Sequence, residues 1–312
     1  MRIGVALGGG GARGWAHIGV LRTLIAAGFA PDVIAGTSMG AIVGGAYAAG
    51  RLDALEVFAR QIDRKAVWRL ADLNLGSGGG LVHGVRIAAA LQEVIGKRDI
   101  NSLAQKFTAV ATDLGAGHEV WLSTGDLVEA MRASYALPGI FVPSRIDGRV
   151  LIDGGITNPV PVSACRALGA HVVIAVPLPA GPSVGPRFAP AVRPGEDSAW
   201  RKALAAFREP ERFVAGQLFG DSPETLTTAS VSVAALNILL DRMTRVRLAS
   251  DPPDVTVTSE IGSIALLEFD RADEAIEIGA EATKRVLPEI AALVAKGAPP
   301  VVGSAMPNQT HS

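Results

Sequence analysis

Residues 33–40 read VIAGTSMG, and this stretch decides the fold. Its first three residues are apolar and predict a short buried strand, while the small-residue segment AIVGGAYAAG that follows predicts a helix. Between them, GTSMG fits the pattern Gly-x-Ser-x-Gly, in which a serine occupies a strained turn from strand to helix. The stretch therefore predicts an α/β fold with Ser38 exposed at the start of a helix.

A second strand, glycine turn and helix precede it: RIGVAL at 2–7, GGGGARG at 8–14, and a periodic apolar segment that ends at Gly28. Beyond residue 50, further strands and helices alternate, and this alternation predicts a mostly parallel sheet flanked by helices. We expect strands at 107–112, 118–123 and 171–178, a hairpin around Asp147-Gly148 that runs into Asp153, and helices at 53–62, 86–95, 125–135 and 161–169.

The chain is expected to divide into four parts. Residues 1–178 form the catalytic core, and 179–198 form a loop or linker dense in proline and glycine. Residues 199–296 form a mainly helical C-terminal extension that packs on the core, and 297–312 form a flexible tail. Within the extension, helices are expected at about 199–219, 223–247 and 273–294, with a strand at 254–259.

The composition of the chain limits its binding partners and its cellular compartment. The formal net charge of −1 offers no electrostatic footprint for nucleic acid. A single cysteine, Cys165, cannot form an internal disulfide, which indicates a reducing cytoplasm. No apolar run reaches the roughly 18 residues that a membrane-spanning helix needs. Hydrophobic residues make up 49% of the chain, enough for a large core and for an apolar surface patch. We therefore expect a cytoplasmic protein, with peripheral contact to a membrane as a further expectation.

The glycine loop and the serine turn both offer amide groups to an anion. Consecutive glycines let N–H groups approach a negative oxygen closely, so Gly9, Gly10 and Gly11 are candidates for an oxyanion hole, with Arg13 bracing the loop or adding charge. The N–H of Met39 is a further candidate because it lies at a helix N-terminus. The structural alternative is a tight turn without a binding role.

Gly9, Gly11 and Gly14 also satisfy the dinucleotide-binding pattern G-x-G-x-x-G. Such a site needs an acid at the end of the second strand, whereas Asp32 precedes that strand. The loop also lacks the Gly-Lys-Ser/Thr ending of a phosphate-binding loop. A nucleotide cofactor therefore remains only a minor alternative.

Ser38 needs a base, since an ordinary hydroxyl is a weak nucleophile at neutral pH. Only His171 and His311 follow Asp153, and neither is well placed for a triad: His171 opens a buried strand and His311 lies in the tail. Asp153 is the better candidate because it ends a strand and two glycines turn the chain directly after it. The alternative is that Asp-Gly-Gly is simply a favourable turn.

Taken together, GGGGARG, GTSMG, ASYALP at 133–138 and DGG at 153–155 stand in the order seen in patatin-like phospholipases, and the resemblance spans roughly residues 2–178. It implies a three-layer α/β/α fold and a serine hydrolase that acts on lipid or other acyl esters through an acyl-enzyme, with no cofactor. Ser38 and Asp153 match the family's catalytic dyad. Gly9, Gly10, Gly11 and Arg13 match its oxyanion loop, and Ala133, Ser134 and Pro138 match a block near the dyad.

A different class of function also stays open, namely a non-catalytic lipid-binding or regulatory protein with a vestigial site. The segment around 200–208 has apolar residues at helical spacing beside basic ones, as in helices that lie on membranes. An amphipathic helix packed on the core explains the same pattern. The residues concerned are Trp200, Leu204 and Phe207, with Arg201, Lys202 and Arg208.

Overall fold

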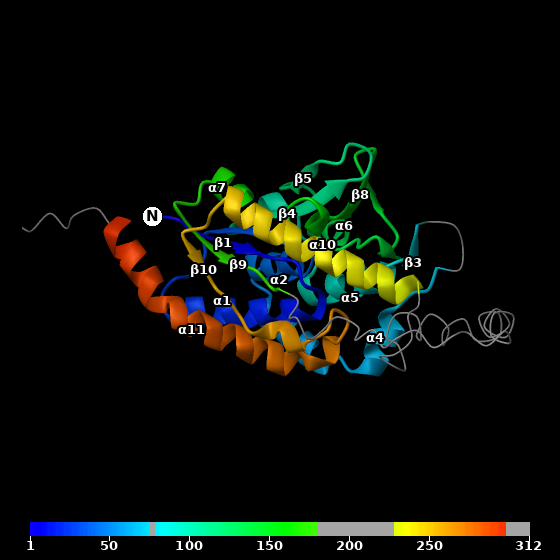
Figure 1. Ribbon diagram of the computed structural model, residues 1–312, viewed down its shortest axis with the longest axis horizontal. Coiled ribbons are helices and arrows are strands. Elements are labelled where there is room, and N and C mark those ends of the chain that lie inside the picture. The colour runs from blue at the N-terminus through cyan, green and yellow to red at the C-terminus, as the bar shows by residue number, and fades with distance from the viewer. Residues whose placement is uncertain (75–78, 180–227, 298–312) are drawn as a thin grey trace, which may run out of the picture.

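The computed structural model describes residues 1–74, 79–179 and 228–297. A central sheet (Figure 1) has the strand order β10-β9-β1-β2-β4-β8-β7, with β5 paired to β4, and β3 and β6 form a separate small parallel pair. β1, β2, β4, β9 and β10 run parallel, whereas the pairings β4–β5, β4–β8 and β7–β8 are antiparallel. The strands are β1 Ile3–Leu7, β2 Val33–Thr37, β3 Gly80–Val82, β4 Lys106–Asp113, β5 Glu119–Leu122, β6 Gly139–Phe141, β7 Ser144–Ile146, β8 Arg149–Asp153, β9 Val172–Val176 and β10 Val255–Thr256.

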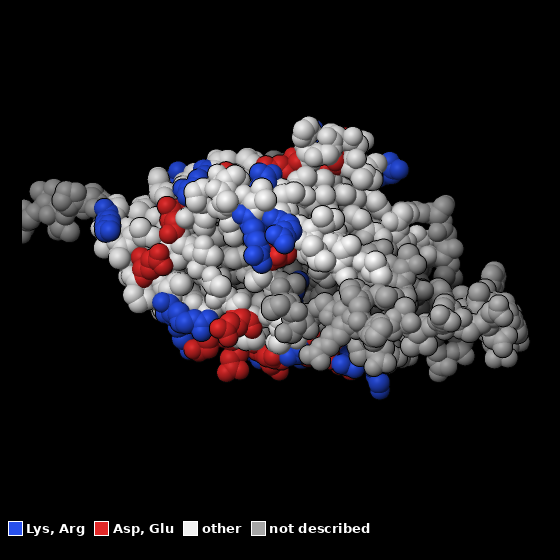
Figure 2. All heavy atoms as spheres, viewed as in Figure 1, with Lys and Arg blue, Asp and Glu red and all other residues white. Residues whose placement is uncertain are grey.

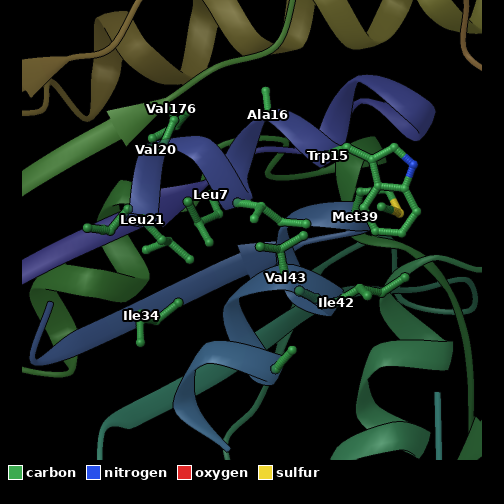
Figure 3. Packing of buried hydrophobic residues seen from close by; sticks show 14 of the residues in the cluster. Leu7, Trp15, Ala16, Val20, Leu21, Ile34, Met39, Ile42, Val43 and Val176 are labelled. Atoms are coloured by element: carbon green, nitrogen blue, oxygen red, sulfur yellow. The ribbon is translucent and has the colours of Figure 1, made fainter. Parts of the chain in front are cut away.

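Helices cover both faces of the sheet. Because successive strand residues point to opposite faces, Val5 and Leu7 pack with α1, α2, α3 and α11, whereas Ala6 packs with α7 and the C-terminal end of α10. Figure 3 shows Leu7 and Ile34 of the strands in the first of these cores, with Val43 of α2. The helices are α1 Ala16–Ala26, α2 Met39–Ala48, α3 Leu52–Gln61, α4 Arg64–Leu70, α5 Val85–Ile95, α6 Leu127–Ser134, α7 Val162–Ala167, α10 Thr228–Ser250 and α11 Ala272–Gly297. The predicted three-layer α/β/α architecture is confirmed.

Two strands share one edge of β4, and this sharing positions the site. On one side, β4 pairs with β5 through residues 109–112. The same strand also pairs with β2 up to the register Thr37↔Val110 and with β8 from Ala111↔Asp153 onward, so both must use its other side. β2 and β8 therefore run toward each other along the same side of β4, and their C-terminal ends meet beside Val110 and Ala111.

The C-terminal part of the chain is joined to the core by close backbone contact. A Cβ at Gly19 of α1 would overlap the carbonyl oxygen of Ile276 in α11, and a Cβ at Gly279 would overlap that of Ala16. Glycines on both helices thus let α11 lie against α1, as Figure 1 shows. None of the helices in the described parts of the chain is long and apolar enough to cross a membrane.

Several elements differ from the sequence predictions. The hairpin around Asp147-Gly148 is confirmed as β7 and β8, whereas α4 and the short β3–β6 pair were not predicted, because their residues show little periodicity over so few positions. The strand expected at 254–259 is only Val255–Thr256, and the helix expected at 223–247 is described from Thr228. The helix expected at 199–219 lies outside the described residues.

The close packing of Gly40, two residues after Ser38, predicts that a larger side chain there destabilises the protein. A Cβ at Gly40 would overlap the carbonyl oxygen of Leu7, so we expect Gly40→Ala to lower the free energy of unfolding by about 3 kcal/mol or more. Gly115→Ala is the matched control, since its Cβ would meet only the Asp113 carboxylate at an ordinary 3.4 Å, and it should stay within about 0.5 kcal/mol of wild type. Urea unfolding followed by circular dichroism measures both, and equal stability of the two variants would contradict the tight packing.

Candidate active site

Ser38 occupies a strained turn between β2 and α2. Its φ of 55° and ψ of −121° lie where L-residues are rare, and its neighbours are glycines for steric reasons: a Cβ at Gly36 would overlap the carbonyl oxygen of Gly40. The backbone N–H of Ser38 donates to the hydroxyl of Ser134 at 2.8 Å, and that hydroxyl donates to the carbonyl of Val110 at 2.6 Å. Ser134, which is fully buried, thus ties the turn to β4.

Asp153 ends β8 directly beside this turn. Its carboxylate is 3% exposed and accepts a hydrogen bond from the N–H of Gly155 at 2.7 Å. Burial raises the pKa of Asp153 from 3.8 to about 6, although the hydrogen bonds from Gly155 and from the side chain of Ser38 act in the opposite direction. The structure therefore brings Ser38 and Asp153 into contact, and the carboxylate is still largely ionised at neutral pH.

The amides of the glycine loop are not equivalent. Gly9 donates its N–H to the carbonyl of Pro159 at 3.0 Å, so this hydrogen is not free for an oxyanion as the sequence suggested. In the parts of the chain that the structure describes, the N–H groups of Gly10, Gly11 and Met39 have no acceptor. All three residues line the same pocket as Ser38 and Asp153. These three amides are the donors available to a developing negative charge.

Arg13 braces this loop from inside the protein. It is 4% exposed, and its Nε donates to the carbonyl of Gly10 at 3.1 Å. In a trans peptide the C=O and the following N–H point in opposite directions, so this bond fixes the direction of the Gly11 amide. Burial lowers the pKa of Arg13 to about 10, while the charge of Asp241 on α10 raises it. The side chain therefore remains a cation beside the site.

His17 is a residue of the site that the sequence analysis did not single out. It is fully buried in α1, and its Nε2 lies 2.8 Å from the carbonyl oxygen of Gly8. Because a carbonyl can only accept, Nε2 carries the proton, and burial lowers the pKa of His17 to about 4, so the ring is neutral. A histidine in the otherwise apolar first turns after the glycine loop was the available signal. His17 holds the start of that loop in place.

An apolar pocket of about 180 Å³ opens beside the dyad. One group of lining residues comes from α3 and the residue after it, from α4 and from α5 and is entirely hydrophobic, whereas α10 contributes polar side chains. The apolar wall consists of Phe58, Ile62, Val67, Leu70, Ile87 and Leu91, and the α10 residues are Asn237, Leu240, Asp241 and Thr244. Such a pocket suits a ligand with a hydrocarbon part and a polar end.

His171 and Asp32, which the sequence analysis also considered, lie away from the pocket. His171 accepts a hydrogen bond from the N–H of Arg2 at the N-terminal end of β9, the sheet edge opposite to Ser38. Asp32 lies at that same edge, where its carboxylate accepts from the N–H of Ile3. His311 and the segment 200–208 lie outside the described residues. Within those residues, no three His, Cys, Asp or Glu side chains gather as metal ligands would.

The sequence is similar to a known protein family and to several known proteins. The model of the family described as "Patatin-like phospholipase" matches residues 5–166. An uncharacterized NTE family protein of Mycobacterium tuberculosis is 44% identical over 185 residues, which cover 59% of this chain and 51% of that protein. "Lysophospholipase nte1" of Neurospora crassa is 32% identical over 179 residues, which cover 56% of this chain and 12% of that protein. The chain thus spans about half the length of its mycobacterial relative and a small part of the fungal one.

Asp153→Asn should stabilise the protein in a pH-dependent way. Because the folded state holds the Asp153 proton more tightly than the unfolded chain, wild type loses stability as pH rises from 3.8 to about 6. The loss amounts to at most about 3 kcal/mol at pH 8, and Asn avoids it. Urea unfolding at pH 8 and near pH 4 should show a large gain at the higher pH only. Asp147→Asn, the same substitution in an exposed turn, is the matched control.

His17→Leu should slow catalysis through the glycine loop. The variant leaves the buried carbonyl of Gly8 without its side-chain donor, at a cost of about 1–3 kcal/mol in stability. We expect kcat for an acyl ester to fall about tenfold or more, with little change in KM. The reason is that the amides of the glycine loop, once less firmly held, stabilise the charge of the transition state less well. His17→Gln retains an N–H donor and should recover part of kcat. Equal kcat in Leu and Gln variants would show that the hydrogen bond has no part in the rate.

Proposed function

Because the chain belongs to the patatin-like phospholipase family, we propose that it hydrolyses carboxylic esters of lipids, with Ser38 as nucleophile and Asp153 as general base. The observation that carries this proposal is the contact between the two side chains where β2 and β8 end beside β4, in one pocket with three amides that have no acceptor among the described residues. A nucleophile, a base and preorganised donors in one pocket are the parts that acyl transfer needs.

The reaction follows from the arrangement. Asp153 accepts the proton of the Ser38 hydroxyl as its oxygen attacks the ester carbonyl, and the amides of Gly10, Gly11 and Met39 stabilise the resulting oxyanion. Asp153 then gives the proton to the leaving alcohol oxygen, which leaves Ser38 acylated. Water, deprotonated by the same carboxylate, releases the fatty acid and restores the serine. Each oxyanion donor contributes roughly 3 to 4 kcal/mol in comparable enzymes.

The pocket suggests how a lipid lies. Its hydrophobic wall of α3, α4 and α5 accommodates the acyl chain, and the polar side near Asp241, Asn237 and Thr244 receives the alcohol part of the ester. The name of the Neurospora relative, a lysophospholipase, makes a lysophospholipid the first substrate to test. Membranes and micelles hold most of such a substrate, and we therefore include peripheral membrane contact in the proposal.

Three variants test the dyad. Ser38→Ala and Asp153→Asn should each abolish hydrolysis of a short-chain acyl ester, because they remove the nucleophile and the base. His171→Ala is the matched control, since His171 lies at the opposite sheet edge, and it should retain most activity. Initial rates are measured on folded protein, together with labelling by a fluorophosphonate probe. Unlabelled but folded wild type would favour a non-catalytic lipid-binding protein, and full activity of Asp153→Asn would contradict the role of the base.

A further inference from the structure

Helix α10 presents apolar side chains along one side to its surroundings. Of the ten large hydrophobic residues that are exposed in the described parts of the chain, four belong to this helix. Their exposed fractions run from 46% to 64%, and their spacing places them on one side of the helix together with Ala235 and Ala249. We call this set the α10 strip: Val231, Ala235, Ile238, Leu239, Val246 and Ala249.

Two arginines accompany the strip. Arg242 and Arg245 are exposed on the same side, while the one carboxylate of the helix, Asp241, lies partly buried at the pocket. Arg245 pairs with Asp241 at 3.0 Å, whereas Arg242 makes no ion pair within residues 1–74, 79–179 and 228–297. Figure 2 shows basic atoms over the C-terminal half of α10 and a broad uncharged area over its N-terminal half. The exposed side therefore combines apolar surface with positive charge.

The opposite side of α10 belongs to the candidate active site. Asn237, Leu240, Asp241 and Thr244 line the pocket that holds Ser38 and Asp153. Arg247 fastens the helix to the loop after Asp153, because its Nε donates to the carbonyl of Thr157 at 2.7 Å. One rigid helix thus forms a wall of the pocket and an exposed apolar strip.

We propose that the α10 strip docks on the surface of a bilayer that contains anionic lipids. An amphipathic helix lies in a membrane interface when apolar side chains enter the acyl region and basic ones meet lipid phosphates, which is the pairing that α10 displays. Docking in this way places the pocket, one helix width away, against the source of its substrate. The proposal rests on the proposed lipid hydrolysis, since that activity is what requires a surface.

The strip can be altered without touching the catalytic groups. Ile238→Gln combined with Leu239→Gln removes its central apolar pair, and neither residue lines the pocket. Arg242→Gln removes the charge that has no ion pair among the described residues, and it leaves Arg245, the partner of Asp241, in place. The matched control is Ile25→Gln with Val57→Gln, two exposed residues of α1 and α3, on the opposite face of the sheet.

Binding of the full chain is measured by co-sedimentation with vesicles of phosphatidylcholine, with and without phosphatidylserine. The apolar double variant should lose about tenfold or more in partitioning to either vesicle, and the arginine variant should lose the preference for phosphatidylserine and its salt dependence. The control should bind like wild type. Turnover of a soluble short-chain ester should be unchanged in all three.

Two results would overturn the docking surface: wild-type binding by the apolar variant, or a dimer of wild type in size-exclusion chromatography that this variant abolishes without a change in vesicle binding. The second result would assign the strip to a second copy of the chain. Failure of the catalytic proposal is distinguishable, because wild type would then bind vesicles through α10 yet not turn over the soluble ester.

Discussion

The site depends on the way two strands share one edge of β4. β2 pairs with β4 as far as Val110. β8 runs in the opposite direction along the same side of β4 and ends at Ala111, so backbone pairing alone brings the ends of the two strands together. Ser38 follows the last residue of β2 and Asp153 is the last residue of β8. Hydrogen bonds of a sheet interior are among the most stable features of a fold, and they fix this approach independently of either side chain.

Both catalytic candidates are held in states that are unfavourable in isolation. Ser38 has a positive φ, and Asp153 is an acid whose charged form is disfavoured by burial. Close packing of glycines and the hydrogen bond to Ser134 hold the turn, while the amide of Gly155 offsets part of the desolvation of Asp153. Strain and buried charge of this kind persist at functional sites because the surrounding structure over-determines them. The same burial raises the pKa of Asp153 to about 6.

The sequence predicted those parts of the site that local chemistry dictates. The pattern Gly-x-Ser-x-Gly supplies the small residues that a strained strand-to-helix turn needs, and Asp147-Gly148 specifies a tight hairpin, so the positions of Ser38 and β8 follow from short stretches of neighbouring residues. Tertiary contacts decided the rest. The N–H of Gly9 donates to the carbonyl of Pro159, which lies 150 positions away in the sequence. The ring of His17 lies at the carbonyl of Gly8 because of the rotation of a buried helix about its axis. No local pattern encodes those pairings.

The candidate catalytic groups and the walls of the pocket come from different parts of this chain. The match to the family ends at residue 166 and contains the glycine loop, Ser38 and Asp153. The pocket, however, is completed by residues beyond it, at Leu178 and Pro179, along α10, and around Phe269. In the proposed reaction, the acyl-transfer groups therefore lie within the part that matches the family, whereas the wall assigned to the substrate's polar end comes from α10, beyond that part. Because α10 also carries the exposed α10 strip, the same helix forms both the proposed substrate wall and the proposed docking surface.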